Sequence, residues 1–283
     1  MDGYDTLIET LNRFERSLDS DTPITTVAEL AQTSGYSTHH FSRLFYSHTS
    51  LHLKEYLQGR LLTSLMMEAA RCDISFAALA SRYGFRDYET FYRACRNRWN
   101  KNPSQLRERG LGEKEKQERL HPQRKETSCI LTGRLVDKEA FTLCGLNFFI
   151  GPETKTFHTM WAQFSRYEHL IGHVLKEGTT YQYSSWTDEE LPCMSVLCAK
   201  SVNQDWMGEE LFTVRRVPAA SYIRFIHTED VTHIRDAYQY IYGTYFAQSP
   251  LQPLGNWEFQ RYPQGQSAIE IYIPVRIETP LPR

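Results

Sequence analysis

The sequence has few cysteines, and their spacing does not suggest a metal site. Its six cysteines are dispersed and include no Cys-x-x-Cys pair, which is the spacing typical of zinc sites and redox motifs. Most of them occur in apolar stretches, where free cysteine packs as a small hydrophobe. They are Cys72, Cys95, Cys129, Cys144, Cys193 and Cys198. We therefore expect no metal and no cofactor.

The sequence also lacks a long apolar run. No stretch approaches the roughly 20 apolar residues that span a bilayer. The first residues, Met1-Asp2-Gly3-Tyr4-Asp5, are acidic, whereas a secretory signal begins with a basic segment and continues with an apolar one. These two absences predict a cytoplasmic protein that makes no contact with a membrane.

Common catalytic motifs are missing as well. The sequence contains no Gly-x-Ser-x-Gly, no His-Glu-x-x-His and no glycine-rich phosphate loop, which are the short patterns that place a nucleophile, a zinc ion or a phosphate. A single carboxylate would need a partner to act as an acid or a base. We therefore predict that the chain is not an enzyme, and we name no catalytic residue.

The composition is that of a folded protein with charge divided unevenly along it. With 283 residues, 41% of them hydrophobic and 13% aromatic, the chain can bury a core in each of two domains. The net charge is −2, but residues 24–110 hold 12 Lys and Arg against 7 Asp and Glu, and residues 111–283 hold 18 against 21. This asymmetry fits a basic nucleic-acid-binding module followed by an acidic domain.

One motif occurs twice in the first hundred residues. The second copy follows the first by 49 residues up to its glycine and by 50 residues after it. The copies are Leu30-Ala31…Gly35-Tyr36…Phe41…Arg43 and Leu79-Ala80…Gly84-Phe85…Phe91…Arg93. Each reads as a short helix, a turn at glycine and a second helix. The repeat predicts two helix-turn-helix units, which could read two adjacent grooves of double-stranded DNA.

Helix signals surround both copies. Thr26-x-x-Glu29 forms a capping-box pattern, and Ser37 and Asp87 are placed to cap the second helix of each unit. An apolar helical pattern over 53–66 predicts a rigid spacer between the units. Residues 7–18 predict a helix that precedes them, and Asp19–Pro23 ends it.

Periodicity divides the rest of the chain into a linker and a second domain. Residues 111–127 are mostly charged and predict a linker between a DNA-binding domain at 1–110 and a domain at 128–283. In that domain the order strand, helix, strand, strand occurs twice, first over 141–149, 161–174, 181–186 and 194–200, then over 219–226, 231–245, 257–262 and 268–275. We predict a multi-domain protein with an all-α double helix-turn-helix domain followed by an α+β domain of two such repeats, with a cleft between them.

Residues 24–107 resemble the AraC/XylS family of bacterial transcription regulators. The motifs are Ser34-Gly35-Tyr36-Ser37, Phe41-Ser42-Arg43-Leu44-Phe45, Tyr56-Leu57…Arg60-Leu61, Gly84-Phe85 and Asn102-Pro103-Ser104…Arg107. The resemblance implies promoter DNA as partner. The base-facing positions, with the adjacent His40, are His39, His40, Ser42 and Arg43 in the first unit and Tyr88, Glu89 and Arg93 in the second. The glycine that usually follows each recognition helix is replaced by Ser50 and Asn100.

Residues 128–278 resemble GyrI-like effector-binding domains. The motifs are Val217-Pro218-Ala219-Ala220…Phe225, Phe259-Gln260-Arg261-Tyr262 and Glu270-Ile271-Tyr272-Ile273-Pro274-Val275. The resemblance implies a pocket of aromatic side chains around a carboxylate, for an aromatic or cationic effector. The family's usual glutamate is Gln260 here. Either Glu258 on the same strand face or Glu270 then supplies the carboxylate, or the ligand is neutral. The full predicted set is Glu258, Gln260, Tyr262, Trp161, Tyr183, Trp206, Tyr222 and Phe225.

Three functions stay open at this point. The leading hypothesis is a sequence-specific transcription regulator whose second domain binds a small effector. A second hypothesis makes that domain a small-molecule hydrolase, because some stand-alone relatives of GyrI-like domains are reported to be hydrolases. A third treats it as a protein-interaction module that contacts RNA polymerase or another partner.

Overall fold

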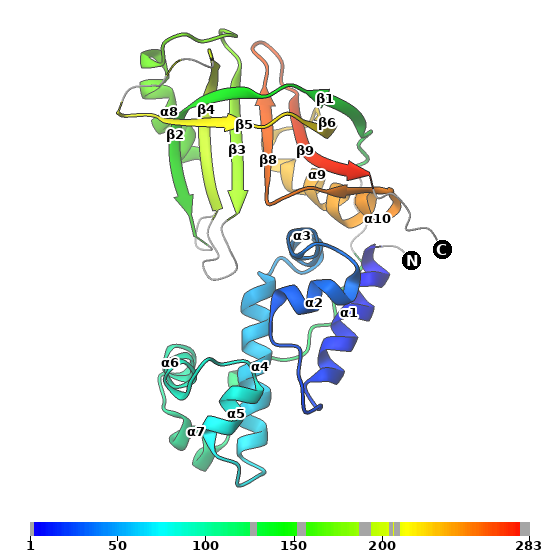
Figure 1. The fold of residues 1–283 in the computed structure, drawn as a ribbon, viewed down its shortest axis with the longest axis vertical. Helices are drawn as coiled ribbons and strands as arrows, with labels where there is room; N and C mark the ends of the chain where they lie inside the picture. The colour runs from blue at the N-terminus through cyan, green and yellow to red at the C-terminus, as the bar shows by residue number, and fades with distance from the viewer. Residues whose placement is uncertain are drawn as a thin grey trace. The chain divides into compact units, whose positions relative to one another are not determined.

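The computed structural model describes residues 3–124, 129–151, 157–186, 194–203, 206 and 210–277. The chain forms two compact units, Met1–Lys125 and Glu126–Arg283 (Figure 1). Among the described residues, no helix combines the length and apolarity needed to cross a membrane.

The first unit is helical and contains both predicted helix-turn-helix units. The central helix α4 packs with α2 and α3 of the first helix-turn-helix unit and with α5 of the second helix-turn-helix unit (Figure 1). This arrangement confirms the predicted spacer. The helices are α1 (Gly3–Ser17), α2 (Val27–Ser34), α3 (Thr38–Thr49), α4 (Leu53–Ala69), α5 (Phe76–Arg82), α6 (Tyr88–Trp99) and α7 (Pro103–Arg109).

The predicted caps are present. At α2 the Thr26 side chain accepts a hydrogen bond from the Glu29 amide, and the Glu29 carboxylate accepts one from the Thr26 amide, both 3.1 Å long. The hydrogen bonds from the Thr90 side chain and backbone amide lower the pKa of Asp87, the cap of α6, to about 2. Helices α3 and α6 close on left-handed residues other than glycine, Ser50 at φ 63° and Asn100 at φ 53°.

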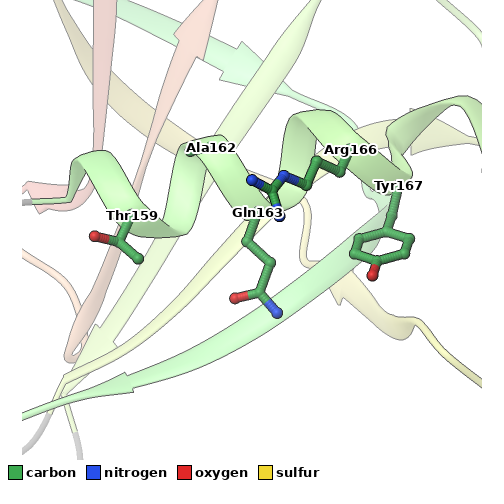
Figure 2. Close-up of a pocket in the computed structure, with 5 residues that line it drawn as sticks. All are labelled: Thr159, Ala162, Gln163, Arg166 and Tyr167. Atoms are coloured by element: carbon green, nitrogen blue, oxygen red, sulfur yellow. The ribbon is translucent and has the colours of Figure 1, made fainter.

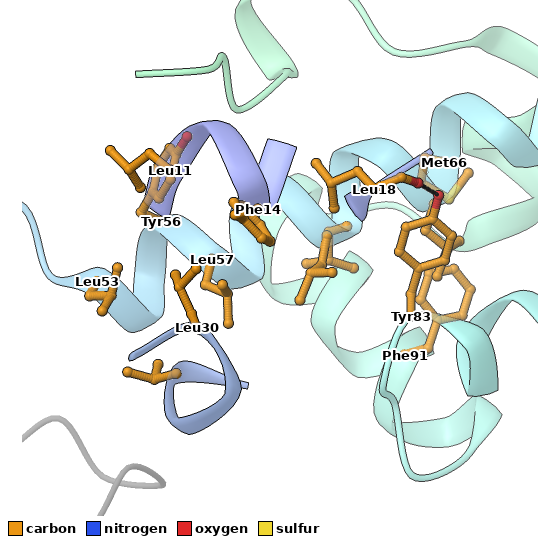
Figure 3. Close-up of a cluster of buried hydrophobic side chains, with 14 of the residues drawn as sticks. Leu11, Phe14, Leu18, Leu30, Leu53, Tyr56, Leu57, Met66, Tyr83 and Phe91 are labelled. Carbon is orange, nitrogen blue, oxygen red and sulfur yellow. Dashed lines mark hydrogen bonds between the residues drawn. The ribbon is translucent and has the colours of Figure 1, made fainter. Parts of the chain in front are cut away.

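A continuous apolar core joins the helices of this unit. Figure 3 shows Phe14 of α1 beside Leu57 of α4, and Tyr83 after α5 reaching back to the carbonyl of Leu18. Phe91 of α6 is fully buried in the same core. Burial of these side chains against α4 holds the two helix-turn-helix units to one scaffold, because the free energy of burial grows with apolar area removed from water.

The segment after Gly110 is docked on the helices of the first unit, which corrects the predicted linker for residues 111–124. The Trp99 indole donates to the Glu115 carbonyl at 2.9 Å, and the Arg60 guanidinium to the Gln117 carbonyl at 2.7 Å. The Gln117 amide donates to the Thr63 hydroxyl at 3.0 Å. Side chains of α4 and α6 thus satisfy backbone groups that a solvated linker would leave to water. Residues 125–127 of the predicted linker lie outside the described residues.

A largely buried ion pair holds α1 against α4. The Arg60 guanidinium lies 2.9 and 2.5 Å from the two Glu15 carboxylate oxygens, and the Tyr56 hydroxyl donates to the same carboxylate at 2.8 Å. The Arg60 and Glu15 side chains are only 15% and 8% exposed. Hydrogen bonds with Glu15 and its negative charge outweigh desolvation and raise the pKa of Arg60.

We expect Glu15→Ala to lower the free energy of unfolding by about 3 kcal/mol or more, because it leaves a buried guanidinium without its carboxylate. The matched control is Glu9→Ala on the same helix, whose ion pair with Arg13 is half exposed and should contribute about 0.5 kcal/mol or less. Urea denaturation followed by helical circular dichroism measures both. Equal losses would show that the Glu15 pair stabilises no more than a surface pair.

The two turn glycines differ in their surroundings, although both have positive φ, 76° at Gly35 and 79° at Gly84. A Cβ added at Gly84 would lie 2.5 Å from the Thr25 Cβ, whereas at Gly35 it would meet no atom within 4 Å. We expect Gly35→Ala to cost the left-handed penalty of about 1–2 kcal/mol, and Gly84→Ala to cost a further 1–3 kcal/mol or so from overpacking. Thermal unfolding of the two variants checks this order, and a Gly84→Ala no worse than Gly35→Ala would contradict it.

The second unit is an antiparallel sheet with helices on one face. The strands are β1 (Arg134–Lys138), β2 (Phe141–Ile150), β3 (Thr180–Trp186), β4 (Met194–Val202), β5 (Thr213–Val217), β6 (Ala220–His227), β7 (Leu251–Pro253), β8 (Trp257–Tyr262) and β9 (Ile269–Ile277). The helices are α8 (His158–Tyr167), α9 (Ile234–Tyr240) and α10 (Phe246–Gln248), with the π-helix η4 (Ile241–Tyr245) between α9 and α10.

The strand order confirms the predicted internal repeat. The order is β1-β6-β9-β8-β3-β4-β2-β5, with β7 paired to β9. The repeat of β2, α8, β3 and β4 matches that of β6, α9, β8 and β9, and the central pair β3–β8 lies on the pseudo-twofold axis (Figure 1). The three additional strands were not predicted: β1 pairs with β6, β5 pairs with β2, and β7 pairs with β9.

The buried side chains of this unit form three apolar clusters, two on the sheet face covered by helices and one on the opposite face. Phe164 of α8 packs with Cys198 of β4 in one half, and Ile241 of η4 packs with Phe225 and Ile271 in the other. The third cluster is largely aromatic and lies on the sheet face away from α8 and α9, where Phe259 stacks on Tyr272 at 4.6 Å between ring centroids. The sheet therefore presents different chemistry on its two faces, because successive strand residues alternate between them.

Candidate functional site

In the first helix-turn-helix unit the recognition helix is α3, and three of its four predicted DNA-contacting residues lie on one side of it. Helical spacing places His39, Ser42 and Arg43 away from the stripe of buried Phe41 and Leu44. All three are nonetheless partly buried, and burial lowers the pKa of His39.

His40 does not lie with them, which corrects its prediction as an exposed residue. It is fully buried, in an i, i+4, i+8 row with the buried Leu44 and His48. Its ring lies 4.1 Å from the Tyr36 ring. A side chain four residues before a buried leucine shares its helix face.

In the second helix-turn-helix unit the recognition helix is α6, and all three of its predicted DNA-contacting residues are exposed. Tyr88, Glu89 and Arg93 lie in its first two turns. Helical spacing places Glu89 and Arg93 opposite the buried Phe91, whereas the Tyr88 ring lies 6.1 Å from the Phe91 ring. The Arg93 guanidinium lies 3.9 Å from the Glu89 carboxylate in an i, i+4 pair. Both side chains are more than half exposed, so the pair can open at little cost to meet a DNA base.

The candidate effector site begins with four polar side chains at the centre of the sheet. In the register of β3 and β8, Gln182 is opposite Gln260 and Ser184 is opposite Glu258. All four are more than nine-tenths buried. Their strand positions place them on the same face as Phe225 and Cys198, which is the face covered by α8 and α9. We call these four residues the polar floor.

Aromatic side chains surround the polar floor. The Trp161 ring of α8 lies 5.0 Å from the Tyr262 ring of β8, nearly perpendicular to it. On the other side Tyr238 of α9 stacks on Tyr242 of η4, with 6.3 Å between ring centroids. Tyr242 belongs to the π-helix, a local widening that is frequent at functional sites. Tyr238 and Tyr242 were not predicted as site residues.

Hydrogen bonds connect the floor to these aromatic residues. The Trp161 indole donates to the Gln182 side-chain oxygen at 3.3 Å, and the Gln260 amide donates to the Tyr238 hydroxyl at 2.7 Å. The Tyr262 hydroxyl donates to the other end of Gln260. Burial raises the pKa of Tyr262, so its hydroxyl keeps the proton that it donates.

Glu258 is the carboxylate of this site. It is 3% exposed, and the Tyr242 hydroxyl donates to it at 2.8 Å. The alternative carboxylate, Glu270, lies on the opposite sheet face, where it accepts hydrogen bonds from Arg261 and from Tyr272, each 2.8 Å long. These partners, and the charge of Arg224, lower the pKa of Glu270 despite its burial. The guanidinium groups of Arg261 and Arg224 therefore balance the charge of Glu270.

Four of the predicted ligand residues lie elsewhere. Tyr183 and Tyr222 occupy the sheet face away from α8 and α9, where both contact Trp257. Phe225 is fully buried under η4, 4.8 Å from the Tyr245 ring. Trp206 packs on the cluster below α8, beside His173. The prediction that all eight residues line one pocket is thus corrected. An aromatic residue in a strand pattern does not by itself indicate the sheet face on which it lies.

The structure also shows why Gln182 and Ser184 were not predicted. Both are small or neutral polar residues in a strand, and their role depends on the strand that pairs with β3. The signal was the alternation in β3, which places Gln182 and Ser184 together and Tyr183 on the other face. Across the described residues, no group of three or more His, Cys, Asp and Glu side chains is arranged to hold a metal.

A shallow pocket also lies along the outer side of α8. Figure 2 shows Gln163 and Arg166 close together on this helix, with Tyr167 at its end. Thr159 and Ala162 complete the lining. None of these residues belongs to the polar floor or was predicted to bind a ligand.

Known families and proteins match both units. A model of the integron-associated effector binding protein family matches residues 134–275, and a helix-turn-helix domain model matches residues 30–109. Transcriptional regulator BrlR of Pseudomonas aeruginosa is 25% identical over 149 residues, which cover 50% of this chain and 54% of BrlR. Multiple antibiotic resistance protein MarA of Escherichia coli is 29% identical over 102 residues, 36% of this chain and 78% of MarA.

An integron cassette protein of Vibrio cholerae is a similar solved structure, with 17% identity, a TM-score of 0.41, and coverage of 52% of this chain and 97% of the other. The chain spans about half the length of BrlR. The family model covers half of the sequence, and the helix-turn-helix match precedes it. The chain therefore belongs to the family of integron-associated effector-binding proteins and carries an AraC-type helix-turn-helix domain before that fold.

Proposed function

We propose that the protein is a transcription regulator that binds promoter DNA with its first unit and a small-molecule effector with its second. The observation that carries the proposal is the pair of recognition helices, α3 and α6, held by one central helix α4. Two such helices on a single chain can enter successive major grooves without a dimer partner. BrlR is itself a transcriptional regulator, which favours regulation over catalysis.

Base recognition rests on an arginine in each recognition helix. Arg43 and Arg93 occupy matching positions in the repeat, each two residues after a buried phenylalanine. An arginine can donate two hydrogen bonds to O6 and N7 of guanine, and each good pair discriminates by about 1–3 kcal/mol. In α6 the neighbouring Glu89 can accept from the N4 amino group of cytosine.

We expect Arg93→Ala to relax base preference at one position of the selected site while leaving the positions read by α3 unchanged. The measurement is selection from a randomised DNA library followed by sequencing, with Arg13→Ala on α1 as a control of equal charge change. A uniform loss of binding on all sequences would instead make Arg93 a phosphate contact.

The effector site suits an organic cation with aromatic character. Glu258 places a carboxylate at the centre of the site, and a carboxylate attracts a cationic ligand. The ring faces of the surrounding aromatic side chains can attract a cation as well. Because the floor also offers the neutral Gln182 and Gln260, polar groups of the effector could exchange for the hydrogen bonds that these amides make within the protein.

We expect Glu258→Gln to weaken binding of tetraphenylphosphonium to the full chain at least tenfold, since it removes the one charged group of the floor. Isothermal titration calorimetry measures the affinity. Glu177→Gln, an exposed glutamate of the same unit, has the same change in net charge and should bind as the parent does. Equal affinity of Glu258→Gln and the parent would move the proposed site away from the polar floor.

Contact with RNA polymerase stays a prediction. A regulator that binds DNA as a monomer can act by contacting polymerase at a neighbouring site, and this would place the third hypothesis, a protein-interaction module, alongside the first. Co-purification of the DNA-bound protein with polymerase addresses that partner separately from effector binding.

A further inference from the structure

A second pocket lies at one edge of the sheet in the effector-binding unit. It is formed where the chain enters β1 and where β6 ends. Two arginines, two isoleucines and two threonines form most of its wall. They are Arg134, Arg224, Ile130, Ile226, Thr132 and Thr228.

The two arginines face each other across paired strands. Arg134 of β1 is the register partner of Arg224 of β6, so their side chains leave the sheet on the same face. Like charges directly opposite on a sheet destabilise it. Within the described part of the chain, no ion pair involves Arg134, and the buried Nε of Arg224 has no hydrogen-bond partner.

The carboxylate that pairs with Arg224, Glu270, does not balance this charge. Glu270 lies 3.8 Å from the Arg224 guanidinium but 2.8 Å from that of Arg261, and Tyr272 also donates to it. Lys138 adds a further positive charge, over the Tyr272 ring at 4.8 Å. Burial and the charges of Arg261 and Arg224 lower the pKa of Lys138, against the opposing effect of Glu270. Glu270 is therefore shared between Arg224 and Arg261, with the positive charge of Lys138 nearby.

Apolar side chains are exposed beside the arginines. Ile130 is 80% exposed and Ile226 is 43% exposed, and both line the pocket. Exposed isoleucines next to guanidinium groups form a surface that favours a ligand with both an anionic group and an apolar part. The threonine hydroxyls of residues 132 and 228 add hydrogen-bond donors at the same wall.

We propose that this pocket binds a small organic carboxylate, with its head group between Arg134 and Arg224 and its apolar body against Ile130 and Ile226. A carboxylate relieves the repulsion between the two arginines and accepts hydrogen bonds from both guanidinium groups, which are the strong charge-assisted kind. Strand alternation places Arg224 on the sheet face opposite Glu258. The pocket is thus separate from the polar floor and has the opposite charge preference.

The test is titration of the full chain with 4-phenylbutyrate. Calorimetry measures the affinity, and changes in amide chemical shifts report which residues the ligand contacts. We expect saturable binding, weakened about tenfold by Arg134→Gln and by Arg224→Gln. Arg216→Gln on the opposite edge strand β5, also exposed, removes the same charge and should leave the affinity unchanged. Arg224→Lys, which keeps the charge, serves if Arg224→Gln does not fold, and it should retain part of the binding.

Two further probes separate the contributions. The neutral 4-phenylbutyramide should bind at least tenfold more weakly, and inorganic phosphate should fail to compete, since it lacks the apolar body. Glu258→Gln should bind 4-phenylbutyrate as the parent does, so loss of the proposed effector site would not affect this result. Equal binding of the amide, effective competition by phosphate, or unchanged affinity in both Arg134→Gln and Arg224→Gln would overturn the proposal.

Discussion

The pairing of β3 with β8 determines both the shape and the chemistry of the effector-binding unit. Six residue pairs join these strands on the pseudo-twofold axis, and each half of the sheet extends outward from them. This register sets Ser184 opposite Glu258 and Gln182 opposite Gln260. A slip of one residue would turn every side chain of a strand to the other face. Glu258 would then leave Tyr242 and enter the aromatic cluster behind the sheet.

The helical unit depends on a comparable scaffold, but its specificity comes from side chains rather than register. Helix α4 contacts both helix-turn-helix units, and the Glu15–Arg60–Tyr56 group attaches α1 and the 111–124 segment to it. Polar anchors of this kind fix the orientation of elements that apolar packing alone would allow to slide. The recognition helix α6 can therefore keep Glu89 and Arg93 exposed without contributing to the core.

Local signals in the sequence were sufficient for most elements and for half of the effector site. Caps such as Thr26 and Asp87 act within one helical turn, and the helical and strand periods of the repeats are also local. Strand β1 escaped prediction because Arg134–Lys138 is short, polar and half exposed at a sheet edge. The docking of 111–124 depends on partners such as Thr63 and Tyr56, more than 50 residues away. Tyr183 and Tyr222 were placed wrongly because their face follows from strand pairing.

Burial alone does not distinguish the two glutamates of the sheet, since both are largely removed from water. What separates them is the charge of their partners. Glu270 is flanked by Arg224 and Arg261, so a bound cation would compete with charges already in place. Glu258 receives a hydrogen bond from the Tyr242 hydroxyl on the helix-covered face, where we propose that it meets a cationic effector. On these proposals one face of the sheet binds cations and the other binds anions, because successive residues of a strand alternate between the faces.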